Sequence, residues 1–142
     1  MFVLDTDIVS LLHAGDVRLL ARRKQFDPLQ IATTIITRIE ILRGRFDFVL
    51  KAADGSQLLR AIHLLARTEE LLRQIPVLPF EDQAAALFDR LRRNKSLKKI
   101  GRADLLIAAT ALANGATVVT RNVRHFRQIH GLMVETWVDS AR

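Results

Sequence analysis

Two carboxylates follow the first apolar segment of the chain. Residues 2–4 read FVL, and Asp5 and Asp7 come almost directly after them. In a parallel α/β sheet, ligands bind beyond the carboxyl ends of the strands, so Asp5 falls where chemistry is usually done. Asp is also a common helix N-cap, and we favour that role for Asp7, just before a helix expected to start near Ile8. Asp5 therefore indicates a site only if further acids lie near it.

A second acid, Asp104, stands at the start of an apolar, alanine-rich helix predicted over residues 102–114. Asp104 shares a helical stripe with Ala108, Ala111 and Gly115, and small residues at that spacing let a helix lie close to a sheet. This stripe would carry the carboxylate inward. An interaction of Asp104 with the helix N-terminus, or an ion pair with Arg102, is equally compatible with the segment.

The third acid, Glu40, lies on a helix predicted over residues 34–45, with Gly44 as its terminator. Glu40 borders the apolar face and could point over the strand ends, while a surface pair with Arg43 is the alternative. Three acids beyond separate strands would repel one another, and a divalent cation would relieve that repulsion. Mg²⁺ or Mn²⁺ suits such hard oxygen ligands, and the sequence has no Cys or His motif typical of zinc.

Short apolar runs alternate with longer helical patterns and predict the elements that position these acids. Uniformly apolar strands such as residues 2–4 are typical of parallel strands covered on both faces. We therefore expect an α/β sandwich with a mostly parallel sheet of four to five strands, in one domain over residues 1–142. The predicted strands are residues 2–4, 29–33, 76–80, 116–120 and 133–137, and the further helices are 55–74, with Ser56 as a candidate N-cap, and 81–93.

The composition fits a packed protein that binds an anionic partner. Hydrophobic residues make up 49% of the 142 residues, and no apolar run approaches the length of a membrane span. The absence of cysteine excludes disulfides and thiolate metal sites, and we expect a soluble, cytoplasmic protein. The net charge of +7 favours nucleic acid or an acidic protein as partner.

Positive charge is concentrated in two short stretches. Residues 90–102, RLRRNKSLKKIGR, hold seven Lys and Arg in 13 positions, and Arg121, Arg124 and Arg127 follow later. These stretches fit either a solvated face or a surface that contacts phosphates. The aromatic content of 6%, with no tyrosine, argues against recognition by extensive base stacking.

Four stretches together resemble a known family: FVLDTDIVS, TRIEILRG, IGRADLLIAATALANGATVVTRN and GLMVETW. Their order and spacing are similar to the motifs of PIN-domain ribonucleases, specifically the VapC-type toxins of type II toxin–antitoxin pairs. The resemblance spans essentially the whole chain. It implies a PIN-like three-layer α/β/α sandwich and a Mg²⁺- or Mn²⁺-dependent endoribonuclease that hydrolyses RNA phosphodiester bonds with metal-activated water. It also implies a homodimer that a small VapB-type antitoxin neutralises.

The resemblance also assigns site residues by matched position. Asp5, Glu40 and Asp104 would be the catalytic acids that hold the metal ion, with Asp5 and Asp104 the surest direct ligands. Thr6 and Thr120 match polar positions of the same pocket. The apolar residues of the helix over 55–74 would serve the antitoxin, the homodimer, or both.

One stretch departs from the family pattern. Many relatives carry a fourth acid just after the fourth strand, where this chain reads TRNVRHF, with Asn122 and His125 at the candidate positions. An amide can orient water and a histidine can touch a phosphate, but neither replaces a fixed negative charge, so the sequence leaves open whether one or two metal ions bind. The candidate RNA contacts are Arg102, Arg121, Lys98, Lys99 and His125.

Two other classes of function fit parts of the sequence. A haloacid-dehalogenase-like phosphatase uses a D-x-D at a strand end, which VLDTD satisfies, with the first Asp as nucleophile. That class also needs a phosphate-binding lysine and an acid pair ending a later strand, whereas ATVVTRN ends without an acid. The other alternative is a catalytically degenerate PIN-like module that binds RNA or protein without cleaving.

Overall fold

The computed structural model describes residues 1–138, and its centre is one parallel β-sheet. The five strands of the described residues lie in the order β3-β2-β1-β4-β5. Their bounds are β1 Phe2–Leu4, β2 Ile31–Thr34, β3 Val77–Leu78, β4 Thr117–Val119 and β5 Met133–Glu135. The predicted parallel sheet is therefore confirmed; β1 has the predicted bounds, and the other four strands are shorter than predicted.

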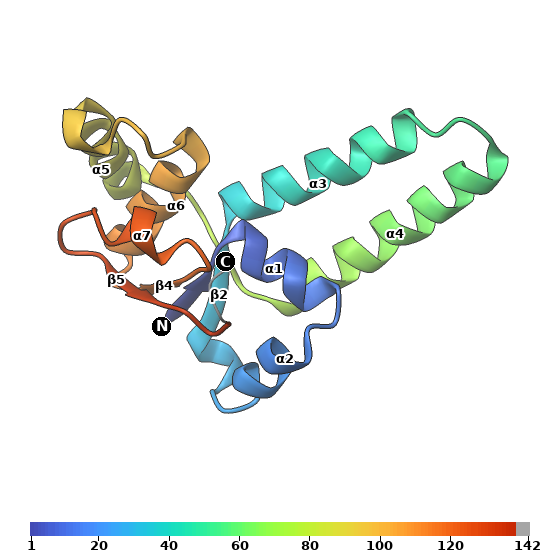
Figure 1. Ribbon diagram of the computed structural model, residues 1–142, viewed down its shortest axis with the longest axis horizontal. Helices are drawn as coiled ribbons and strands as arrows, with labels where there is room; N and C mark the ends of the chain where they lie inside the picture. Colours follow the sequence, from blue (N-terminus) through green and yellow to red (C-terminus); the bar gives the residue numbers. More distant parts are fainter. Residues whose placement is uncertain (139–142) are drawn as a thin grey trace.

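Helices cover both faces of the sheet and give each face its own core (Figure 1). Leu4 of β1 packs with Ile8 of α1, whereas Val3 packs on the opposite face with Ala108 of α6. The arrangement is the three-layer α/β/α sandwich that the resemblance implied. The helices are α1 Thr6–His13, α2 Val17–Arg23, α3 Ile35–Leu50, α4 Gly55–Gln74, α5 Asp82–Arg93, α6 Arg102–Ala113 and α7 Val123–Phe126.

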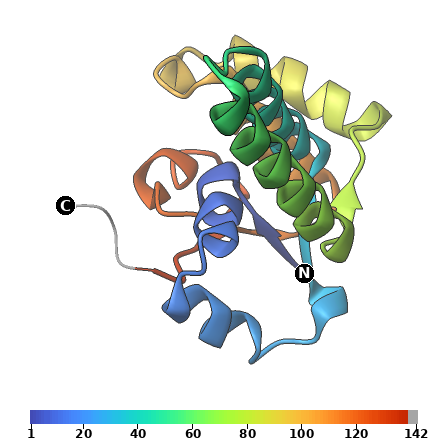
Figure 2. The same ribbon diagram turned by 90° about the vertical axis from the view of Figure 1, so that its right-hand side faces the viewer.

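Helices α3 and α4 lie side by side and extend away from the sheet (Figures 1 and 2). We call residues 35–74 the arm. Helix α3 runs through Gly44 to Leu50, so the predicted end near residue 45 is wrong. Gly44 has no positive φ here, and glycine ends a helix mainly when it adopts the left-handed conformation. The arm exposes a set of large apolar side chains: Ile39, Phe46, Phe48, Leu50, Leu58, Leu59 and Ile62.

Two predicted helix caps are also wrong. Helix α1 begins immediately after β1, so its N-cap is Asp5, whose Oδ1 accepts a hydrogen bond of 3.0 Å from the Ile8 amide. Asp7 lies within the first turn instead. Helix α4 is capped by Asp54, which accepts from the Gln57 amide at 2.8 Å, rather than by Ser56. In both cases the cap is the residue whose carboxylate can reach the free N–H three positions later.

The strand order places a crevice at the carboxyl ends of β1 and β4. Strand β1 pairs with β2 on one side and with β4 on the other, so the connections leave β1 in opposite directions. Parallel α/β sheets bind ligands at such a switch point. Asp5 follows β1 and Thr120 follows β4, so both stand at this crevice.

Helix α4 is the longest helix in the described residues. Its 20 residues include charged side chains from Arg60 to Arg73. Across residues 1–138, no helix combines the length and the apolar character that crossing a membrane requires.

Candidate active site

A polar pocket of about 150 Å³ lies at the crevice. We call it the acid pocket, and its lining residues are Asp5, Thr6, Asp7, Glu40, Asp104 and Asn122. They come from the start of α1, from α3, from α6 and from the segment after β4. The structure thus brings together the three acids singled out in the sequence, and it adds Asp7, for which capping was the favoured role.

Asp5 is the most buried acid of the pocket, with 5% of its surface exposed. Burial raises the pKa of Asp5 to about 6, and the charges of Asp7 and Asp104 push it in the same direction. Hydrogen bonds from the Thr120 side chain and the Ile8 amide oppose this rise but do not cancel it. The negative charge of Asp5 is therefore costly until a cation compensates it.

A chain of hydroxyl groups fixes Glu40. Thr6 Oγ1 donates to Glu40 Oε1 at 2.6 Å and lies 3.1 Å from Thr37 Oγ1. Because Thr6 has one hydroxyl proton and gives it to Glu40, Thr37 must be the donor to Thr6. Thr34 Oγ1 in turn donates to Thr37 Oγ1 at 3.4 Å. Glu40 is thus held over the strand ends, and no ion pair between Glu40 and Arg43 occurs in the described residues.

Asp104 is half-buried and faces the pocket, as its stripe of small residues predicted. Burial raises its pKa, and the charges of Glu40 and Asp7 add to the rise, while His125 lowers it. Arg102 forms no ion pair with Asp104 among residues 1–138, and its guanidinium lies instead 5.2 Å from the centre of the Phe88 ring.

Asn122 and His125 form a hydrogen-bonded pair beside the acids. Asn122 Nδ2 lies 2.7 Å from His125 Nδ1, and the Asn122 backbone amide donates to Thr120 Oγ1 at 2.8 Å. With the amide as donor, His125 Nδ1 is the acceptor of this hydrogen bond. Asn122 lines the acid pocket, and its second amide N–H remains for a ligand.

The predicted cationic RNA contacts do not line the acid pocket. Arg121 is half-buried next to Thr120, Lys99 is exposed, and Lys98 lines a different pocket. Arg102 is exposed one turn before the buried part of α6. The structure therefore separates the acids from most of the positive charge.

The donor set of the acid pocket fits a hard divalent cation. Its side chains offer oxygen and amide groups, and within residues 1–138 none of its four acids has an ion-pair partner. In the same residues no group of three or more His, Asp or Glu side chains could by itself hold a metal ion. Mg²⁺ usually takes one or two carboxylates directly and keeps several waters, which is the arrangement these residues can supply.

Two residues of the site escaped the sequence reasoning. The sequence favours a capping role for Asp7, although its position two residues after Asp5 places it at the same strand end. Thr37 is absent from the predicted site, although it lies three residues before Glu40 and hence on the same face of the helix. The spacing T-x-x-E was the signal that could have identified Thr37.

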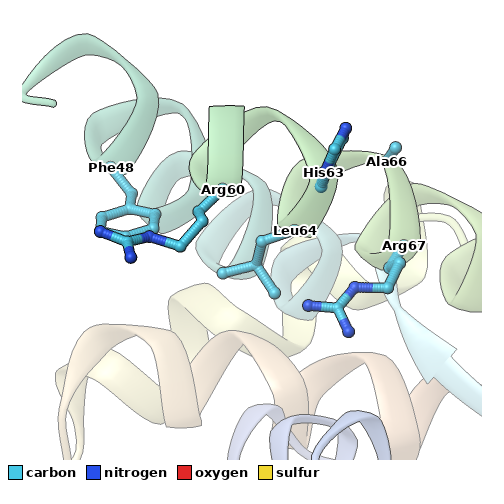
Figure 3. Close-up of a pocket in the computed structure, with 6 residues that line it drawn as sticks. All are labelled: Phe48, Arg60, His63, Leu64, Ala66 and Arg67. Atoms are coloured by element: carbon cyan, nitrogen blue, oxygen red, sulfur yellow. The ribbon is translucent and has the colours of Figure 1, made fainter. Parts of the chain in front are cut away.

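A larger pocket of about 780 Å³ lies on the arm, and we call it the arm pocket (Figure 3). It is formed by Phe48 of α3 and by residues of α4, among them Arg60, His63 and Arg67. No carboxylate lines the arm pocket. Its chemistry therefore differs from that of the acid pocket.

Comparison with known proteins identifies the class to which this fold and site belong. The PIN domain matches residues 2–132, and the chain belongs to the PIN-domain family. Ribonuclease VapC1 of Haemophilus influenzae strain R2866 is 28% identical over 141 residues, which cover 96% of this chain and 98% of that protein. The tRNA(fMet)-specific endonuclease VapC of Salmonella typhimurium is 26% identical over 138 residues, covering 96% and 97%.

A solved structure agrees with these relatives. The DNA-bound VapBC complex from Salmonella typhimurium superposes with a TM-score of 0.79 and 26% identity, covering 96% of this chain and 98% of that one. The resemblance to VapC-type PIN-domain ribonucleases that the sequence motifs indicated is therefore confirmed.

Proposed function

We propose that this protein is an endoribonuclease, the toxin of a toxin–antitoxin pair, and that it hydrolyses RNA phosphodiester bonds with Mg²⁺ or Mn²⁺. The observation that carries the proposal is the convergence of four unpaired acids on one pocket at the switch point of the sheet. The raised pKa values of Asp5 and Asp104 support it, because perturbed carboxylates gather where charge has a function. The names of the relatives, ribonuclease and endonuclease, point to the same reaction.

Asp5 and Asp104 are the residues that we assign to the cation. A divalent cation in this pocket would lower the pKa of the attacking water and neutralise charge on the phosphoryl oxygens. Glu40, held by the Thr6 hydroxyl, orients water in the pocket. Asp5 must lose its proton before it can bind a cation, so its raised pKa sets a lower limit on the working pH.

Asn122 is the residue that we assign to the substrate phosphate. One of its amide protons goes to His125, and the other is available to a phosphoryl oxygen. Asn122 carries no charge. The carboxylates of the pocket are therefore those of Asp5, Glu40 and Asp104, with Asp7 as the fourth. In this assignment Asp7 partly replaces the acid that is missing after the fourth strand.

The arm is the surface that we assign to protein partners. Its exposed apolar side chains are too many for an isolated helical pair to leave in water without a function. A VapB-type antitoxin and a second copy of the chain are the partners that the family implies. A toxin of this kind would act in the cytoplasm.

The test is RNA cleavage by the purified protein with 5′-end sequencing of the products. The RNA named for the Salmonella relative, tRNA(fMet), is the first substrate to try. We expect metal-dependent fragments from wild type and from the surface control Asp89→Asn, whose carboxylate pairs with Arg92 on α5. Asp5→Asn should give none.

Each rival has a distinct outcome. RNA binding in EDTA, with no cleavage under any divalent cation, would establish the degenerate binding module. A stable aspartyl-phosphate formed from a phosphomonoester would establish the phosphatase. Wild-type cleavage by Asp5→Asn would remove the metal-site assignment.

A further inference from the structure

A third pocket, of about 550 Å³, lies between α5 and α6. We call it the basic pocket, because its rim carries Arg92, Arg93, Lys95 and Lys98. All four side chains belong to exposed residues. The pocket gathers much of the positive charge of the stretch 90–102, which in the sequence alone fitted a solvated face equally well.

Buried apolar side chains and a side-chain hydrogen bond fix the backbone of the basic pocket. Leu97 and Ile100 are 3% and 5% exposed and anchor the loop in the core of the α5–α6 face. Asn94 Oδ1 accepts a hydrogen bond of 3.0 Å from the Ser96 amide and closes the turn that follows α5. Together with Leu105, the two anchors give the pocket an apolar floor below its cationic rim.

Most of the rim charge is uncompensated. Arg92 pairs with Asp89 at 3.2 Å. Across residues 1–138, by contrast, Arg93, Lys95 and Lys98 have no ion-pair partner. Unpaired cations around an apolar floor suit a ligand with one anionic and one apolar part. A nucleotide has both, and pockets of several hundred Å³ are the size that takes small ligands.

The basic pocket and the acid pocket share the first turn of α6. Asp104 lines the acid pocket, and the next residue, Leu105, lines the basic pocket. Consecutive helical side chains point about 100° apart. The two pockets therefore open on neighbouring sides of one helical turn, with a separation on the order of the ~10 Å diameter of a helix. A single RNA strand can span that separation with a few nucleotides.

We infer that the basic pocket binds one nucleotide of the RNA, with its phosphate among Arg93, Lys95 and Lys98 and its sugar or base over Leu97. This inference rests on the proposed function, because it takes RNA as the substrate. It assigns the pocket to the RNA strand that continues from the acid pocket. No aromatic side chain lines the pocket, so the pocket contacts the RNA backbone and does not recognise the RNA sequence by base stacking.

The test measures RNA binding separately from cleavage. The protein carries Asp104→Asn, and a fluorescent single-stranded RNA of 20 nucleotides is titrated in EDTA while anisotropy is read. The variant is Lys95→Gln with Lys98→Gln. The matched control removes two exposed cations from the arm pocket, Arg60→Gln with Arg67→Gln.

We expect the Lys95/Lys98 variant to bind about tenfold more weakly at 0.1 M salt, and its salt slope of log K to fall by about 1.4, or 0.7 per lost phosphate contact. The arm control should keep the wild-type slope, and Lys95→Arg with Lys98→Arg should restore binding. Equal losses in variant and control would overturn the inference, since only net charge would then matter. So would displacement of the RNA by poly-glutamate at equal charge concentration, since an acidic protein would then fit as well.

A cleavage experiment separates this inference from the proposed function. The active protein carrying Lys95→Gln and Lys98→Gln is compared with wild type on the 20-nucleotide RNA and on a dinucleoside monophosphate, whose single phosphate must lie in the acid pocket to be cleaved. We expect a raised KM on the long RNA and unchanged cleavage of the dinucleotide. Equal defects on both substrates would contradict the inference. Absence of RNA cleavage by the wild-type protein would contradict the proposed function. The anisotropy experiment would still decide whether the basic pocket binds RNA.

Discussion

The acid pocket and the arm pocket differ in size and in the side chains that line them, and it is the smaller one to which we assign the reaction. The arm pocket is larger, about 780 Å³ against about 150 Å³, but it is lined by exposed cations and apolar groups from two neighbouring helices. The acid pocket contains carboxylates whose pKa values are raised by burial. The volume of a pocket therefore does not identify the site of a reaction. Buried carboxylates with raised pKa values are a better indicator, because a charge that is costly to bury is usually there for a function.

The two regions also differ in how the chain builds them. The arm is a local hairpin, and its exposed apolar residues are close in sequence. The acid pocket needs residues as far apart as Asp5 and Asp104, and it is held by hydrogen bonds such as Thr6 to Glu40. We therefore expect substitutions in the acid pocket to change catalysis, and substitutions on the arm to change association with other proteins.

The largest expected effect separates the two pockets directly. Asp104→Asn should lower RNA cleavage by on the order of 10³-fold, because it removes a charge that we assign to the cation. His63→Gln in the arm pocket should leave cleavage unchanged. Both rates are measured with saturating Mn²⁺ on the same RNA. Comparable losses in the two variants would break the distinction between the pockets.

The pH dependence of RNA cleavage should reflect the titration of the Asp5 carboxylate. Its pKa is raised to about 6, so below that pH the protonated form dominates and competes with cation binding. Cleavage at low Mn²⁺ should fall by about tenfold per pH unit below pH ~6. Raising the Mn²⁺ concentration should move this decrease in cleavage to lower pH, because the cation and the proton compete for the Asp5 carboxylate. A flat profile down to pH 4.5 would contradict the assignment.

The stability of the metal-free protein should rise when the charge of Asp5 is removed. The folded pKa of Asp5 lies above the unfolded value of 3.8, so the folded state binds more protons between pH 3.8 and about 6. The contribution of Asp5 to the stability of the wild-type protein is therefore lost as the pH rises from 3.8 to about 6. At pH 8 in EDTA, Asp5→Asn should add about 2–3 kcal/mol to the free energy of unfolding.

Urea denaturation measures this gain, and a matched control is available. Asn can still accept the hydrogen bond from the Ile8 amide, so the cap is kept. Asp16→Asn, at the N-cap of α2, changes a carboxylate whose side chain is more exposed and should alter stability little. A loss of stability in Asp5→Asn would mean that its charge is compensated in the fold.

The smallest predicted effect concerns the hydroxyl chain that holds Glu40. Thr37→Val keeps the side-chain volume but removes the donor to Thr6 and the acceptor for Thr34. We expect a loss of about 1 kcal/mol of stability and a reduction of kcat of less than about tenfold. Thr37→Ser should behave like wild type. If Thr37→Val also leaves kcat unchanged, the orientation of Glu40 does not limit the reaction.

The sequence was sufficient to predict the architecture. Uniformly apolar strands such as Phe2–Leu4 indicated a parallel sheet, and the alternation with helices indicated two covered faces. The placement of Asp104 followed from the small residues on its own stripe. These features are local patterns with a direct physical meaning, so a single sequence is enough to detect them.

Features that depend on tertiary context were missed. The helical conformation of Gly44 is set by the surrounding helix and its packing, not by the residue type. Asp5 caps α1 because α1 starts at once after β1, and that boundary is not visible in the composition. The hydroxyl chain from Thr34 to Glu40 depends on α1 lying against α3, and the separation of acids from cations depends on α6 lying between two pockets.

The central claim is that the acid pocket holds a divalent cation, and calorimetric titration with Mn²⁺ at pH 7.5 tests it most directly. Wild type and Asp89→Asn should bind Mn²⁺ alike, whereas Asp5→Asn and Asp104→Asn should each bind at least about tenfold more weakly, as expected when a charged ligand is lost. Equal Mn²⁺ affinity in all four proteins would contradict the claim.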